Sequence, residues 1–255
     1  MFSRRILFYA GLLFLLPWAT SSFAQHANYA PNSIHFCQLQ KKYAVTLGGG
    51  FGRGSSFAST EWQAAFSPVE HGAIMINYFD AHRSPVQRKE EEGTSSRFGE
   101  IGIGAYETTA IGTASIFVGY GQGSIFNNYV LNRAASFNMS RWFIQPAIVR
   151  HSSNFEWGIA LRFNRLIYSD GEVDYSIADY DLRAVQAIEA RSPFFIPELG
   201  LHVGLTFSPC TFSMNLTSVF YAANRYNFDR INSSFLLTLD IGRFYQKKQK
   251  KPLED

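Results

Sequence analysis

Titratable side chains recur at alternate positions of several apolar segments, and this spacing limits the chemistry that they can perform. They are Glu61, Glu100, Glu156, Arg162, Glu198, His202 and Asp240. If the segments are strands of one sheet, alternate residues share a face, so unlike charges can pair across an enclosed interior. The same groups could instead line a narrow water-filled pore, or two carboxyl groups could act as an acid and base pair. We expect a plugged interior held by ion pairs around Arg162.

A second candidate for chemistry is the run His151-Ser152-Ser153-Asn154. It resembles the His-x-Ser-Asn motif of outer-membrane lipid A deacylases, in which a histidine activates a serine for acyl transfer and an acid orients the histidine. The resemblance implies that His151 is the base and Ser153 the nucleophile. The run also lies between two predicted strands on the periplasmic side, where serine and asparagine are common turn formers, whereas those enzymes act at the outer leaflet. We therefore expect no catalytic residue and keep the hydrolase as the alternative.

Other signatures of bound cofactors are missing from the sequence. No cysteine and histidine spacing typical of a metal site occurs. The glycine run at 48–52 lacks the lysine and the serine or threonine of a phosphate-binding loop, so glycine flexibility at a strand end explains it better. We expect neither a cofactor nor a metal ion.

Period-two alternation of apolar and polar residues dominates the chain after its first 40 residues. It is clearest at 155–164, where five apolar residues alternate with small or charged ones, and at 196–207. Such alternation predicts half-buried strands. The same test predicts ten strands, at 42–51, 57–66, 73–80, 97–106, 113–123, 138–149, 155–168, 196–207, 211–221 and 233–244. Most have the length of about 9–11 residues of a tilted membrane strand.

The links between these strands alternate in length. Short turns are expected at 67–72, 108–112, 151–154 and 208–209, and long polar links at 81–96, 124–137 and 169–195. The link at 52–56 is short and that at 222–232 is intermediate. Short periplasmic turns opposite long external loops are typical of outer-membrane barrels. The expected fold is therefore all-β, a closed antiparallel transmembrane β-barrel of about ten strands, with eight to twelve allowed.

In a closed barrel the apolar face of each strand points either inward or outward, and the alternation in the sequence is compatible with both arrangements. A lipocalin-like barrel would turn its apolar face inward, and a membrane barrel outward. Aromatic residues at the ends of the apolar face favour the membrane barrel, because they would form an interface belt. These are Trp62, Tyr78, Trp142, Trp157 and Phe244. We expect Leu201 and Ile159 to face lipid, and His202 and Arg162 to face the lumen.

The N-terminal residues predict export. Arg4 and Arg5 precede the apolar run 6–18, and Ser22 and Ala24 follow at the spacing of a cleavage site. We expect a signal peptide at 1–24, a periplasmic segment at 25–41, the barrel at 42–245, and a basic periplasmic tail at 246–255. Cys37 and Cys210 would then lie in an oxidising compartment, where a bridge between them or two free thiols are both possible.

Three short stretches resemble small outer-membrane barrel proteins of Bacteroidetes-type bacteria. They are 29–32 (Tyr-Ala-Pro-Asn), 141–146 (Arg-Trp-Phe-Ile-Gln-Pro) and 235–242 in the last strand. The resemblance implies an outer-membrane address and supplies no site residues. We expect a structural, adhesive or narrowly permeable protein that contacts membrane lipid and lipopolysaccharide, and the barrel-assembly machinery during insertion. The net charge of +3 is too small to indicate nucleic-acid binding.

Overall fold

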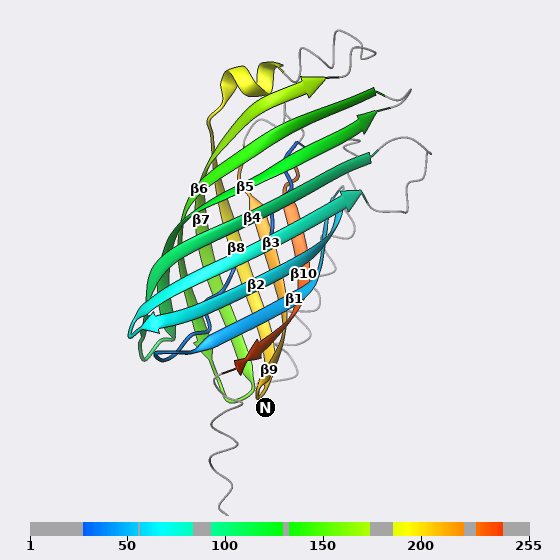
Figure 1. Ribbon diagram of the computed structural model, residues 1–255. Helices are drawn as coiled ribbons and strands as arrows, with labels where there is room; N and C mark the ends of the chain where they lie inside the picture. Colours follow the sequence, from blue (N-terminus) through cyan, green and yellow to red (C-terminus); the bar gives the residue numbers. More distant parts are fainter. Residues whose placement is uncertain are drawn as a thin grey trace, which may run out of the picture.

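Ten antiparallel strands close into one barrel (Figure 1). The structure, a computed structural model, describes residues 28–55, 57–83, 93–129, 133–173, 186–221 and 228–241. Each strand pairs with its neighbour in the chain, and the first and last strands pair with each other. The strands are β1 (Val45–Gly54), β2 (Phe57–Val69), β3 (Gly72–Arg83), β4 (Gly93–Thr108), β5 (Thr113–Tyr129), β6 (Arg133–His151), β7 (Phe155–Val173), β8 (Phe194–Phe207), β9 (Cys210–Val219) and β10 (Ile231–Asp240). The predicted fold class is confirmed.

Seven strands are longer than the sequence predicted, β2 to β8, and the largest differences are in β4 to β7. β4 to β7 have 16, 17, 19 and 19 residues, more than the roughly 9–11 residues that cross hydrocarbon. Figure 1 shows them reaching past their neighbours at one end of the barrel. Parts of the predicted loops at 81–96, 124–137 and 169–195 are therefore strand, because backbone pairing continues where the apolar alternation stops. The predicted link at 52–56 is likewise too long, since Gly52 and Gly54 belong to β1.

The two ends of the barrel differ in their connections. The links β2–β3, β4–β5, β6–β7 and β8–β9 are short, as predicted, and we call their end the short-turn end. The opposite, long-link end holds the extended parts of β4 to β7 and a short helix at 186–191. Ile188 of this helix packs into the apolar cluster there, with Phe137 and Phe194. Among the described residues, no helix is long and apolar enough to cross a membrane.

Alternation separates an apolar outer wall from a buried lumen that holds charged and polar side chains as well as apolar clusters. In β8, Leu201 is 37% exposed whereas its neighbour His202 is 3% exposed. Ile159 is exposed and Arg162 is buried in β7, so the predicted orientation of these four residues is confirmed. Four of the predicted belt residues, Trp62, Tyr78, Trp142 and Trp157, are exposed, while Phe244 lies outside the described residues.

Glycines on the inner face leave room for aromatic rings in the lumen. A β-carbon on Gly121 would lie 2.5 Å from the ring of Phe98, and one on Gly119 would overlap the ring of Phe143. Both rings are buried. Aromatic side chains therefore fill part of the barrel interior, and the two glycines allow these rings to lie close to the opposing strand backbone.

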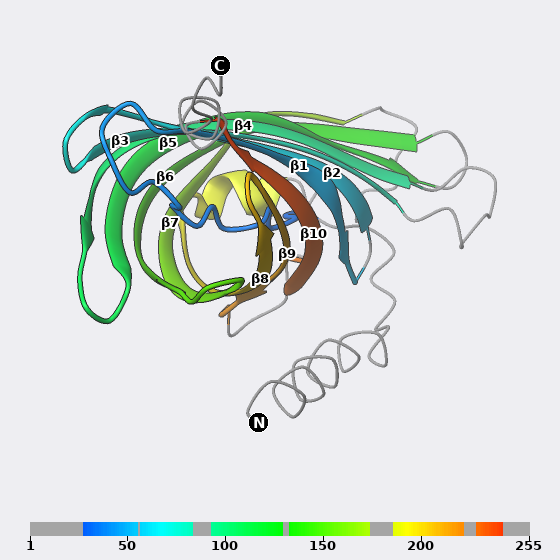
Figure 2. The same cartoon turned by 90° about the horizontal axis from the view of Figure 1, so that it is seen from below.

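The N-terminal segment lies inside the barrel, which corrects the predicted periplasmic segment at 25–41. Residues 28–39, called here the luminal segment, cross the interior in Figure 2, and most of them are buried. At the long-link end Tyr29 forms a parallel bridge with Phe228. At the short-turn end the Tyr43 N–H donates to the Ser67 carbonyl oxygen at 2.7 Å. Residues 28–40 carry no lysine, arginine, aspartate or glutamate. The segment therefore brings none of these four charged residue types into the lumen.

The barrel wall separates the two cysteines. Cys37 is buried in the luminal segment, and Cys210 begins β9 on the face opposite to buried Thr211. Both are free thiols. The predicted signal peptide at 1–24, residues 84–92 of the predicted link at 81–96, and the predicted basic tail at 246–255 lie outside the described residues.

Candidate functional site

Four charged side chains meet in the middle of the lumen. Glu100, Arg141, Arg162 and Glu198 come from the inner faces of β4, β6, β7 and β8, and all are buried. Arg162 lies directly opposite Glu198 in the pairing of β7 with β8. The closed barrel turns these four positions toward one another, although 98 residues separate Glu100 from Glu198 in the chain.

The four groups form a neutral network, which we call the luminal ion-pair network. The Nε of Arg162 donates to Oε2 of Glu198 at 2.6 Å, and its Nη1 lies 3.5 Å from Oε1 of Glu100. Arg141 pairs with Oε2 of Glu100. The two positive and two negative charges therefore balance one another inside the lumen. Such balance is necessary, because an unpaired buried charge is strongly destabilising.

The luminal segment completes this network with neutral groups. Oδ1 of Asn32 accepts from Arg141 at 2.8 Å and from Arg162 at 3.0 Å, while its Nδ2 donates to Glu100 at 3.1 Å. The hydroxyl of Tyr29 accepts from Arg141 at 2.8 Å and donates to Glu198. Hydrogen bonds to charged groups are roughly twice as strong as those between neutral groups. The network thus fixes the segment in the lumen.

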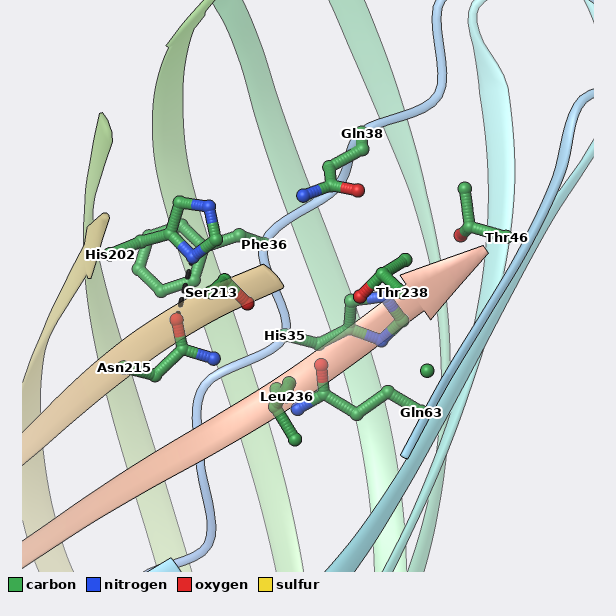
Figure 3. Close-up of a pocket in the computed structure, with 11 residues that line it drawn as sticks. His35, Phe36, Gln38, Thr46, Gln63, His202, Ser213, Asn215, Leu236 and Thr238 are labelled. Carbon is green, nitrogen blue, oxygen red and sulfur yellow. Dashed lines mark hydrogen bonds between the residues drawn. The ribbon is translucent and has the colours of Figure 1, made fainter. Parts of the chain in front are cut away.

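A second polar cluster lies nearer the short-turn end. Nε2 of His202 is 2.9 Å from Oε1 of Glu156, and its Nδ1 is 2.6 Å from Oδ1 of Asn215. Figure 3 shows the His202 ring stacked on Phe36 of the luminal segment, with centroids 4.9 Å apart. Beside it is a cavity of about 10 Å³, room for about one water molecule. Little free space is therefore left beside His202.

The His151 run acquires an acid that the sequence did not indicate. Nδ1 of His151 lies 3.1 Å from Oε2 of Glu156, the first luminal residue of β7. Ser153 is exposed in the β6–β7 turn, and within the described part of the chain no hydrogen bond joins it to His151. The structure therefore pairs the suggested base with a carboxylate but does not bring the suggested nucleophile to it.

Most of the predicted polar face is buried, as expected, but it forms three groups rather than one. Glu100 and Glu198 join Arg162, Glu156 joins His202, and Glu61 stands apart. Asp240 is half-buried at the end of β10.

The sequence reasoning missed Arg141, Asn32 and Tyr29 as members of the network. The neighbours of Arg141 on the inner face of β6 are apolar, Met139 and Phe143, and Ser140 beside it is polar but points outward, so the alternation does not mark the arginine as luminal. Among the described residues, no group of three or more His, Cys, Asp or Glu side chains is arranged to hold a metal ion.

Fold and site together define a closed antiparallel barrel with an apolar outer wall and a filled, ion-paired lumen. In sequence, the chain matches no family model and no curated protein. Among solved structures, it is similar to LpxR from Salmonella typhimurium, with a TM-score of 0.42 and 7% identity over 76% of this chain and 99% of that chain.

Proposed function

We propose that this protein is an integral outer-membrane barrel whose lumen is sealed, and whose role is structural or adhesive with narrow permeability at most. The observation that carries the proposal is the luminal segment, fixed through Asn32 and Tyr29 to a neutral network of buried charges. A wall that is apolar outside and a lumen filled by polar and apolar side chains suit a bilayer. A β-sheet can span a bilayer only if it has no free edge.

The arrangement of the links supports an orientation in the membrane. Outer-membrane barrels place short turns in the periplasm and longer loops outside. The extended parts of β4 to β7 and the helix at 186–191 would then project from the cell. A sealed lumen leaves these projecting elements and the outer wall as the surfaces that can contact other molecules.

Epitope insertion tests both the address and the orientation. An epitope placed between Gln87 and Arg88, in the β3–β4 link, should be labelled by antibody on intact cells. The matched control carries the epitope between Ala110 and Ile111, in the short β4–β5 turn, and should be labelled only after the outer membrane is permeabilised. Labelling of the control alone on intact cells would show that the orientation is the opposite one. Labelling of neither protein in outer-membrane fractions would refute the outer-membrane location.

The pairing of His151 with Glu156 supports one other candidate, a hydrolase that removes acyl chains from lipid A. A histidine held by a carboxylate is the usual base for a serine nucleophile. If this candidate is correct, lipid A from cells expressing the protein loses an acyl chain, and Ser153→Ala and His151→Ala abolish the loss whereas the neighbouring Ser152→Ala does not. Unchanged lipid A with the wild-type protein would exclude it.

A further inference from the structure

Glu61 is a buried carboxylate with no cationic partner among the described residues. It lies on the inner face of β2 and is 2% exposed. The ion pairs of the described residues join Glu100, Glu198 and Glu156 to arginine or histidine, but none includes Glu61. Its oxygens accept from the Ser33 N–H at 3.0 Å, from Nδ2 of Asn232 at 2.7 Å and from Oγ of Ser59 at 3.3 Å. These donors are neutral, so the charge of an ionised Glu61 would be uncompensated.

A second, independent observation points to the same place. Asn232 is 0% exposed, and its Oδ1 has no hydrogen-bond partner in the part of the chain that the structure describes. A β-carbon built on Gly52 would lie 2.7 Å from this Oδ1, 2.7 Å from Oε1 of Glu61, and closer still to Oγ of Ser59. Three oxygen atoms, from Ser59, Glu61 and Asn232, therefore lie within 2.7 Å of the point where a side chain at Gly52 would begin, so they face the Gly52 backbone together.

We infer that Glu61, Asn232 and Ser59 form a binding site for a small monovalent cation, Na⁺. A carboxylate, an amide oxygen and a hydroxyl are hard oxygen ligands of the kind that hard cations prefer. A single positive charge would neutralise Glu61, whereas a divalent ion would leave an excess positive charge in the lumen. The unsatisfied oxygen of Asn232 would gain a partner at the same time. This inference is independent of the proposed function.

The site lies where the barrel closes. Gly52 of β1 pairs with Ser59 of β2 on one side and with Ser234 of β10 on the other, and Asn232 is two residues away on β10. A cation held by β2 and β10 would link the strands on both sides of β1. Because the Ser33 N–H also donates to Glu61, the ion would reinforce the closing seam and the adjacent luminal segment together.

Thermal unfolding in different salts tests the inference. The full-length protein in detergent micelles is heated in NaCl, KCl, CaCl₂ or choline chloride at equal ionic strength, and unfolding is followed by circular dichroism. We expect the midpoint in NaCl to exceed that in choline chloride by about 2–4 °C or more, and to rise with Na⁺ concentration. Glu61→Gln, which keeps the shape of the side chain, should fold and lose this difference.

A pair of glycine variants provides a matched control. Gly52→Ala places a methyl group against all three oxygens, which must move apart, and should also lose the sodium effect. Gly48→Ala lies on the same face of β1, where the added carbon meets Oγ1 of Thr238 at 3.0 Å, and should keep it. Equal midpoints in NaCl and choline chloride for the wild type would overturn the site and indicate a protonated Glu61. A sodium effect that persists in Glu61→Gln, or a shift with KCl or CaCl₂ larger than with NaCl, would overturn the assignment.

Discussion

Replacing Arg162 by methionine should lower the free energy of unfolding by about 3–5 kcal/mol, because it removes one partner from a buried ion pair and leaves the other charged. Arg162 is fully buried and contacts both carboxylates of the luminal network, Glu198 and Glu100. Its loss leaves Arg141 to balance two carboxylates. Urea unfolding in detergent micelles, followed by tryptophan fluorescence, measures the change.

Two further variants separate the network from a general effect of losing an arginine. Arg165→Met removes an exposed arginine from the outer face of the same strand and should not destabilise the protein. Adding Glu198→Gln to Arg162→Met should recover part of the lost stability, because the orphaned charge is then removed as well. An Arg162→Met protein as stable as the wild type would show that the ion pairs are not needed to hold the lumen together.

Replacing Leu201 by arginine should destabilise the inserted barrel by about 2–4 kcal/mol, the cost of a charged side chain on a lipid face near the midplane. Leu201 lies in the middle of β8 and faces outward. Phe207→Arg, at the end of the same strand and also exposed, is the matched control and should cost only about 0–1 kcal/mol. Refolding into lipid vesicles measures both values. Equal costs at the two positions would contradict a lipid-facing wall with its midplane near Leu201.

The sequence predicted all ten strands, because a strand with an apolar outer face and a more polar inner face shows a period-two alternation. β8 shows this well, since its predicted range of 196–207 is close to Phe194–Phe207. The same signal underestimated the lengths of β6 and β7. At the long-link end these strands still pair through their backbones, although their side chains no longer alternate between apolar and polar. Strand pairing does not depend on side-chain polarity, so alternation alone cannot mark where it ends.

The luminal segment could not be predicted in the same way. It has no regular strand or helix pattern, and its partners are far away in the chain, as with Asn32 and Arg141, which are 109 residues apart. Arg162 was predicted at the centre of the network because it is a charged residue on the polar face of a clear alternation. Glu61 was predicted to be luminal, but its lack of an ion pair with any described arginine follows only from the arrangement of the closed barrel.

Conductance of the purified protein in planar bilayers tests the sealed lumen most directly. The luminal segment, the ion-pair network and the cluster around His202 leave no wide path through the described part of the barrel, so small ions should pass weakly or not at all. Stable, porin-like conductance from the wild-type protein would contradict the sealed lumen, and would mean that the segment at 28–39 leaves the barrel or that several chains form a wider pore.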